Sequence, residues 1–116
     1  MSKRQTSELL LDIKEAAKRI SGYISGMSYP KFLDDQKTQD AVVRNIEIIG
    51  EAVKKLPETF RAQYPDMPWK EIAGTRDKLI HDYFGVNFDI LWNISENEIP
   101  GIRTKIDKLL KIEGGR

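Results

Sequence analysis

The chain has 116 residues, a length typical of one domain with a single modest hydrophobic core. It contains no cysteine, which excludes disulfide bonds and cysteine-ligated zinc and is typical of a reducing compartment. Its 19 basic and 18 acidic residues give a formal net charge of +1, so the chain lacks the overall basic bias of dedicated duplex-binding proteins.

The sequence carries no signal for export or for membrane insertion. No apolar run approaches the roughly 20 residues that a membrane-spanning helix needs. The first residues, from Met1 to Gln5, lack the apolar core of a signal peptide. We therefore expect a cytoplasmic protein that does not enter a membrane.

Three segments carry apolar residues at the spacing of an α-helix, and no segment alternates long enough to predict a strand. We therefore expect an all-α fold, most simply an antiparallel helical bundle with short additional helices in its middle connections. Because there is no repeat, low-complexity tract or linker, residues 1–116 are predicted to form a single domain. The three apolar stripes consist of Leu9, Leu10, Ile13, Ala16, Ala17, Ile20 and Ile24, then Val42, Ile46, Ile49, Val53 and Leu56, and finally Ile99, Ile102, Ile106, Leu109 and Leu110.

Capping residues predict where several helices begin and end. Asp34-Asp35 precedes the second stripe and can accept hydrogen bonds from the first free N–H groups of that helix. Thr75 can cap a short helix that Gly85 ends, and Asn87 can cap the helix after it. The segment 97–100, with its asparagine and proline, is predicted to begin the last helix, which the two glycines at 114–115 end.

Gly50 lies in the middle of the second predicted helix, where glycine costs about 1 kcal/mol relative to alanine. We therefore expect another backbone to approach it closely, either within the bundle or across a dimer interface. Arg44, Glu47 and Glu51 recur at helical spacing on a different face from the apolar stripe. They form either a solvated Arg–Glu pair, which is the commoner case, or a polar shell around a site.

The segment from Arg76 to Tyr83 holds the only histidine, His81. Imidazole has an unperturbed pKa near neutral pH, so His81 is the first candidate for proton transfer, although a lone histidine is more often a surface or packing residue. On a continuous helix Arg76 and Tyr83 share a face roughly 10 Å apart, whereas His81 lies about 140° around the axis from Arg76. Either the helix ends near Asp82, therefore, or a second chain completes the site.

Several common kinds of site do not fit this segment. Metal sites built on histidine need further ligands, and the spacings H-x-x-x-H and H-x-x-E are absent. No cysteine and no nearby serine can act as a nucleophile beside His81, and no phosphate-binding glycine loop is present. Asp77 precedes His81 by four residues, which suits orienting or charging the imidazole. We therefore expect no metal and no bound cofactor.

The Arg–His pair suits the cleavage of RNA by its own 2′-hydroxyl group. Imidazole can remove the proton of that hydroxyl or supply one to the leaving 5′ oxygen, and guanidinium matches the geometry of phosphate. Because each chain has one histidine, an acid–base pair of histidines requires a dimer that brings two copies together.

Three blocks of the chain resemble HepT-like proteins of the HEPN superfamily. Arg76, His81 and Tyr83 match the signature R-x4-6-H-x-Y. Residues 44–52 (RNIEIIGEA) resemble the family segment R-N-x-x-x-I-G-E-A, and residues 68–76 (PWKEIAGTR) resemble P-W-x-x-I-x-x-x-R. The resemblance covers almost the whole chain, from near position 9 to near position 110.

This resemblance implies a HEPN-like α-helical homodimer whose R-x4-H motifs line a shared cleft. It also implies a metal-independent endoribonuclease, the toxin of a type VII-like toxin–antitoxin pair, which a nucleotidyltransferase antitoxin of the MNT type blocks by AMPylation. The dimer is expected to assemble further with that antitoxin. By position, Arg76 would bind the scissile phosphate, His81 would transfer protons and Tyr83 would accept AMP, while Asp77 would orient the site. The residues assigned to a surrounding shell or to the dimer interface are Arg44, Gly50 and Glu51.

Two other interpretations stay open. In the first, the chain is a non-catalytic partner subunit that presents a nucleotide or substrate to a nucleotidyltransferase, and it leaves RNA intact. In the second, it is a structural dimerisation domain, which would leave the pairing of Arg76 and His81 without a purpose.

Overall fold

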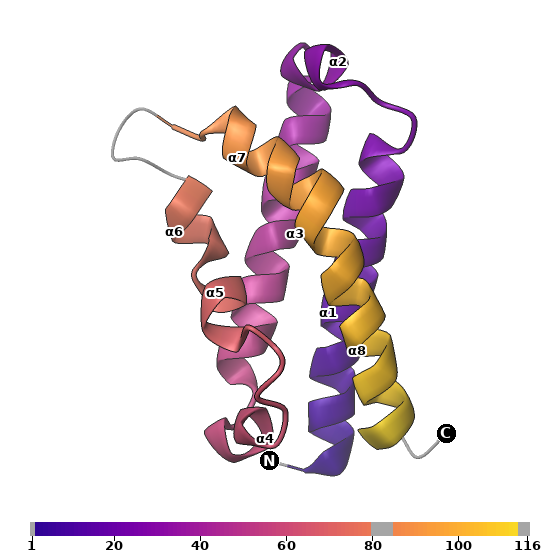
Figure 1. Cartoon of the computed structure of the whole chain (residues 1–116), viewed down its shortest axis with the longest axis vertical. Coiled ribbons are helices and arrows are strands. Elements are labelled where there is room, and N and C mark those ends of the chain that lie inside the picture. Colours follow the sequence, from indigo (N-terminus) through magenta and orange to yellow (C-terminus); the bar gives the residue numbers. More distant parts are fainter. Residues whose placement is uncertain (1, 80–84, 114–116) are drawn as a thin grey trace.

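The computed structural model describes residues 2–79 and 85–113, and these ranges are mostly helical and contain no strand. Three long helices run along the molecule, and shorter ones connect them (Figure 1). The long helices are α1 (Lys3–Ile24), α3 (Gln36–Lys55) and α8 (Ile99–Glu113). The short elements are α2 (Tyr29–Leu33), α4 (Glu58–Ala62), α5 (Trp69–Ala73), α6 (Thr75–Leu79), α7 (Phe88–Asn93) and the π-helical turn η1 (Ile94–Glu98). None of the described helices has both the length and the apolar character that crossing a bilayer requires.

The core lies between the three long helices. α1 packs against both α3 and α8, which run antiparallel to it (Figure 1). The three predicted apolar stripes supply the contact, so the predicted antiparallel helical bundle is confirmed. The buried members of the stripes are Leu10, Ile13, Ala16, Ala17 and Ile20 of α1, Val42, Ile46, Ile49, Val53 and Leu56 in or just after α3, and Ile99, Ile106 and Leu109 of α8.

The short helices α5 and α6 lie on the other side of α3 from α1 (Figure 1). Trp69 of α5 is buried, and its indole Nε1 donates to the carbonyl oxygens of Arg61 and Tyr64, both at 3.1 Å. Ile72 of α5 and Leu79 of α6 are also buried. The hydrogen bonds of Trp69 join α5 to α4 and the residues after it, while both α5 and α6 pack against α3. α6 carries the first residues of the Arg–His motif.

Two predicted helix caps are confirmed. Asp35 precedes α3, and its Oδ1 accepts the backbone N–H of Thr38 at 3.0 Å. Asn87 precedes α7, and its Oδ1 accepts the backbone N–H of Ile90 at 3.1 Å. Both side chains satisfy an N–H group that has no partner within its own helix.

The predicted cap at Thr75 is wrong. Thr75 is itself the first residue of α6, and its hydroxyl donates to the carbonyl oxygen of Glu71 at 2.9 Å. The hydroxyl therefore serves a carbonyl group of α5 and does not accept a free N–H group at the start of α6. Gly85 has a φ of 84°, which glycine adopts without strain. The helix end predicted just before it, and the helix end predicted at 114–115, lie outside the described residues.

The last helix, α8, begins at Ile99, inside the predicted range 97–100, but it does not begin as a free helix end. α7 continues through η1 into α8, and Asn97 lies inside η1 (Figure 1). Pro100 has no N–H group, so an α-helical carbonyl four residues before it would have no donor. Instead, the N–H of Ile99 donates to the carbonyl oxygen of Ile94, five residues back. The wider turn accommodates the proline inside a continuous helical run.

Candidate functional site

The candidate site begins where α5 meets α3 at Gly50. A Cβ atom on Gly50 would lie 3.4 Å from the carbonyl oxygen of Ala73 and 3.9 Å from that of Ile72. The close approach expected at this glycine is therefore made by a backbone of the same chain. Because α6 follows α5 after Gly74 alone, this contact determines where the first turn of α6 lies.

Arg76, in the first turn of α6, forms an ion pair with Glu47 of α3. The guanidinium Nε donates to Glu47 Oε2 at 2.8 Å. The side chain of Arg76 is 53% exposed and that of Glu47 is 31% exposed, so a ligand in solution can reach the pair. The two residues are 29 positions apart in the sequence, and the docking of α5 on Gly50 brings them together.

Arg76 and Asp77 line a hollow of about 290 Å³ together with one face of α3. Four of the residues predicted for the site or its shell meet in this hollow, which gives the candidate site a location. They are Arg76, Asp77, Gly50 and Glu51. The charged residues that line it are three carboxylates, Glu47, Glu51 and Asp77, and two cations, Lys54 and Arg76.

Lys54 of this hollow was not predicted as a site residue, and Glu47 was named only as one member of a possible polar shell around a site. Glu47, Gly50, Glu51 and Lys54 recur at i, i+3, i+4 and i+7, so they share one face of α3. The glycine marks the face that another segment covers. Charged neighbours of such a glycine at helical spacing are therefore the residues that meet the covering segment, and this signal is present in the sequence.

Arg44 lies apart from this hollow. It lines a separate hollow of about 200 Å³ between α1 and α3, which it shares with Glu51 and Lys55. Within the described ranges Arg44 makes no ion pair with Glu47 or Glu51, so the solvated pair suggested by helical spacing does not form. Glu51 lines both hollows and lies at the border between them.

The predictions for His81 and Tyr83 fall outside the described residues, and so does the helix end predicted near Asp82. The roles assigned to these side chains rest on the sequence motif. Arg76 and Asp77 are the motif residues whose surroundings the structure gives.

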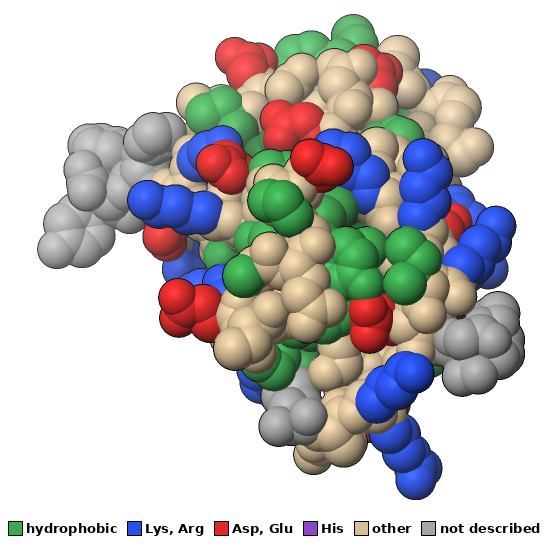
Figure 2. All heavy atoms as spheres, turned by 60° about the horizontal axis from the view of Figure 1, so that its bottom comes forward, with side chains coloured by type: hydrophobic (Ala, Val, Ile, Leu, Met, Phe, Trp, Pro, Cys, Tyr) green, Lys and Arg blue, Asp and Glu red, His purple; other side chains and the backbone are tan. Residues whose placement is uncertain are grey.

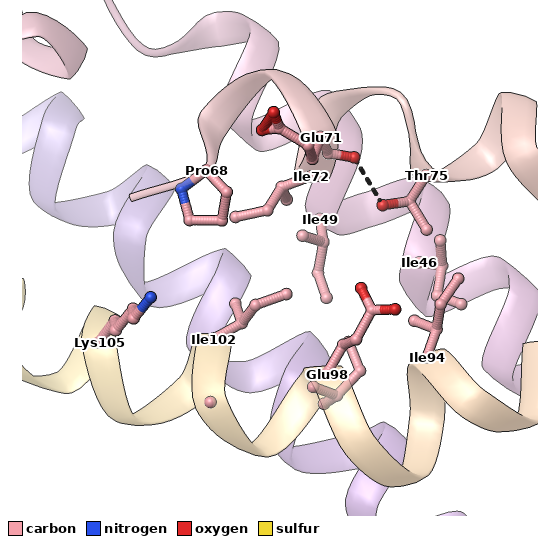
Figure 3. Close-up of a pocket in the computed structure, with 12 residues that line it drawn as sticks. Ile46, Ile49, Pro68, Glu71, Ile72, Thr75, Ile94, Glu98, Ile102 and Lys105 are labelled. Carbon is pink, nitrogen blue, oxygen red and sulfur yellow. Dashed lines mark hydrogen bonds between the residues drawn. The ribbon is translucent and has the colours of Figure 1, made fainter. Parts of the chain in front are cut away.

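A second cavity, of about 210 Å³, lies between α3, α5 and the start of α8. Figure 3 shows Ile49, Ile72 and Ile102 pointing toward one another across it. The carboxylate of Glu98 reaches into it from the α8 side, and Lys105 stands at one end (Figure 3). The lining is mostly aliphatic, its charged residues are Glu71, Glu98 and Lys105, and none of its residues is the arginine or histidine of the Arg–His motif.

The surface charge is mixed at the end of the molecule where α4 and the end of α8 lie. Among the described side chains in Figure 2, lysines and arginines alternate with acidic residues around an apolar area. That face therefore offers no broad basic surface of the kind that attracts nucleic acid without regard to sequence. In the described ranges, no group of three or more acidic or histidine side chains is placed to hold a metal ion.

Comparison with known proteins places this chain in a family. A family model described as "Ribonuclease HepT-like" matches residues 13–109. A protein of Methanocaldococcus jannaschii named "Putative RNase" is 48% identical over 115 residues, which cover 98% of this chain and 95% of that protein. The "Probable ribonuclease HepT" of Thermococcus cleftensis is 45% identical over 109 residues, which cover 94% of this chain and 99% of that protein.

A protein of Caldanaerobacter subterraneus subsp. tengcongensis, also named as an RNase, is 49% identical over 90 residues, which cover 78% of this chain and 80% of that protein. No solved structure gives a significant match. The family model covers both helices of the hollow and the whole Arg–His motif. The chain therefore belongs to the HepT-like ribonuclease family.

Proposed function

We propose that this protein is a metal-independent endoribonuclease in which Arg76 binds the scissile phosphate and His81 transfers protons. The observation that carries the proposal is the position of Arg76. Its side chain is half exposed and lines a surface hollow, and Glu47 binds one edge of its guanidinium. An ion pair this exposed contributes little to stability, so a ligand-binding role explains the arginine better. Membership of the HepT-like ribonuclease family supports RNA as the substrate.

The proposed reaction is the attack of a 2′-hydroxyl oxygen on the neighbouring phosphorus. A new O–P bond forms while the bond from phosphorus to the 5′ oxygen of the next nucleotide breaks. The products are a 2′,3′-cyclic phosphate and a 5′-hydroxyl group. The 2′-hydroxyl proton passes to a base, and the leaving oxygen takes a proton from an acid; imidazole can serve in either role. Guanidinium would bind the phosphate oxygens as their negative charge grows.

A homodimer is part of the proposal, because each chain has one histidine. Separate imidazoles for the base and the acid require that two copies bring their motifs together. Activity per chain should then fall when the protein is diluted until sedimentation shows monomers. Full activity in a strict monomer would contradict the shared site.

We place regulation on Tyr83, two residues after His81. An MNT-type nucleotidyltransferase would transfer the AMP group of ATP to the phenol oxygen and release pyrophosphate. The added phosphate would bring negative charge to the motif that holds Arg76. In this proposal residues 1–116 form a single domain that acts as a cytoplasmic toxin, and the transferase is its antitoxin. Intact mass after co-expression should show whole AMP increments that disappear in Tyr83→Phe. Increments that persist in Tyr83→Phe would assign the modification elsewhere.

The test of the activity compares the wild type with Arg76→Ala and His81→Ala on a defined RNA in the presence of a metal chelator. The wild type should produce fragments with cyclic phosphate ends, and both variants should lose most of that activity while keeping their helical circular dichroism. An oligonucleotide with 2′-deoxyribose at every position should stay intact, because it lacks the attacking hydroxyl. Undiminished cleavage by His81→Ala would contradict the mechanism.

The charge of the hollow favours one alternative, a non-catalytic partner subunit of a nucleotidyltransferase. Three carboxylates and two cations line the hollow, an unfavourable balance for an RNA backbone on its own. A purified protein that binds the transferase or a nucleotide tightly, and leaves RNA intact as monomer and as dimer, would establish this alternative.

A further inference from the structure

We infer that Glu47 is a positioning residue for Arg76: it fixes the guanidinium so that its outer edge faces the phosphate. The inference rests on the proposed function and adds a residue outside the Arg–His motif to it. The contact between Arg76 Nε and Glu47 Oε2, at 2.8 Å, is the observation that carries it.

The contact uses the Nε atom of Arg76 and neither of its Nη atoms. Guanidinium has five N–H donors in a planar fork, one on Nε and two on each Nη. Glu47 accepts the hydrogen of Nε, which lies nearest the Arg76 stem. The edge formed by the two Nη groups, the edge that binds phosphate bidentately, points away from that bond. One hydrogen bond thus sets the plane of the guanidinium and leaves its binding edge available.

Stability does not account for this pair. Exposed ion pairs contribute about 0–1 kcal/mol, and the side chains here are 53% and 31% exposed. The chain contains a comparable pair in Arg4 and Glu8, whose Nε and Oε1 lie 3.3 Å apart with side chains 89% and 60% exposed. That pair links neighbouring turns of α1, whereas Glu47 holds Arg76 across two helices. The Arg4–Glu8 pair is therefore a matched control.

Glu47 also reduces the positive potential at Arg76. With Glu51 and Asp77 it makes the lining of the hollow net acidic, since only Lys54 and Arg76 are basic there. Removing the Glu47 charge should strengthen the binding of an RNA backbone, while losing the hydrogen bond should slow turnover. A residue with a merely structural role would not change binding and turnover in opposite directions.

The experiment compares Glu47→Ala and Glu47→Gln with the wild type, with Glu8→Ala as the control. Glu47→Ala should lower kcat about 10- to 100-fold, because a misoriented group loses that much. It should bind a 2′-O-methyl RNA, which cannot be cleaved, about two- to fivefold more tightly. Glu47→Gln keeps an oxygen that can accept the Nε hydrogen, so its kcat should stay within about threefold of the wild type. Glu8→Ala should match the wild type in both quantities.

Two results would overturn the inference: a kcat of Glu47→Ala within twofold of the wild type, or an equal loss of kcat in Glu47→Gln and Glu47→Ala. A measurement that needs no catalysis separates this inference from the proposed function. In the wild type, the NMR signal of the Arg76 Nε–H should exchange slowly with water, and Glu47→Ala should make that exchange fast. If the wild type does not cleave RNA, the proposed function fails, and unchanged Nε–H exchange in Glu47→Ala would refute the inference by itself.

Discussion

The carbonyl oxygen of Ala73 lies 3.4 Å from the position that a Cβ atom on Gly50 would occupy. This distance is an ordinary van der Waals contact, so a methyl group fits there and a longer side chain does not. The contact sets the height of α5 above α3, and α6 with Arg76 follows directly. The geometry of the candidate site therefore depends on the size of one residue in α3.

We predict that Gly50→Ala keeps or raises the free energy of unfolding, by up to about 1 kcal/mol, because alanine favours the helix. Gly50→Leu should lower it by about 1–3 kcal/mol, because the longer side chain pushes α5 outward. Chemical denaturation measures both. Gly22 of α1, where an added Cβ would meet nothing within 4 Å, provides the control substitution Gly22→Leu. Equal effects of leucine at the two positions would contradict the proposed close contact.

Arg76→Lys should keep the binding of non-cleavable RNA within about threefold but lower kcat by about 10-fold or more. Lysine retains the charge, but it has no Nε–H for Glu47 and no planar fork for phosphate. The measurement is kcat on a defined RNA beside the Kd for its 2′-O-methyl analogue. Arg4→Lys, at the matched pair in α1, should have no effect on either quantity. A fully active Arg76→Lys would mean that Arg76 acts only through its charge.

Asp35→Ala should lower the melting temperature at neutral pH, and this difference should become smaller in acid. The Thr38 hydroxyl and then its backbone N–H donate to the carboxylate and hold the pKa of Asp35 below 3.8. A lowered pKa in the folded state gives stability that is fully present above pH 3.8. It is lost as the pH falls through the folded-state pKa. Asp40→Ala, at an exposed position of α3, is the control for the loss of an acidic side chain. A difference between Asp35→Ala and the wild type that is as large in acid as at neutral pH would contradict this assignment.

Tyr64 should lose its proton at a higher pH than an ordinary tyrosine. Its hydroxyl donates to Glu113 of α8, and this bond, with burial and the nearby carboxylate charge, raises the pKa of Tyr64 to about 12. Its contribution to stability is thus fully present below pH 10.0 and is lost as the pH rises through about 12. Phenolate absorbance should show one tyrosine titrating near that value, and Glu113→Gln should bring it down toward 10.0. An unchanged titration in Glu113→Gln would contradict the contact.

Local signals in the sequence predicted the parts of the fold that depend on neighbouring residues. The caps at Asp35 and Asn87 were correct because such a cap needs only its own side chain and the helix that follows. The continuity of α7 with α8 was missed because a π-helical turn can accommodate a proline, and no local pattern marks such a turn. The partner of Glu47 could not be read from spacing within α3, since Arg76 reaches it only after α5 has docked on Gly50.

The π-helical turn keeps the two ends of the last helical run in phase. Leu91 and Ile99 are both buried, with 0% and 2% exposure. Eight α-helical residues, at about 100° each, would turn these side chains about 80° apart, whereas the wider turn brings them closer to one line along the helical run. The wider turn at Ile94–Glu98 takes up this difference. An unbroken α-helix would rotate α7, which packs against α6. Pro100 thus helps to set how α7 lies against α6, the helix that carries Arg76.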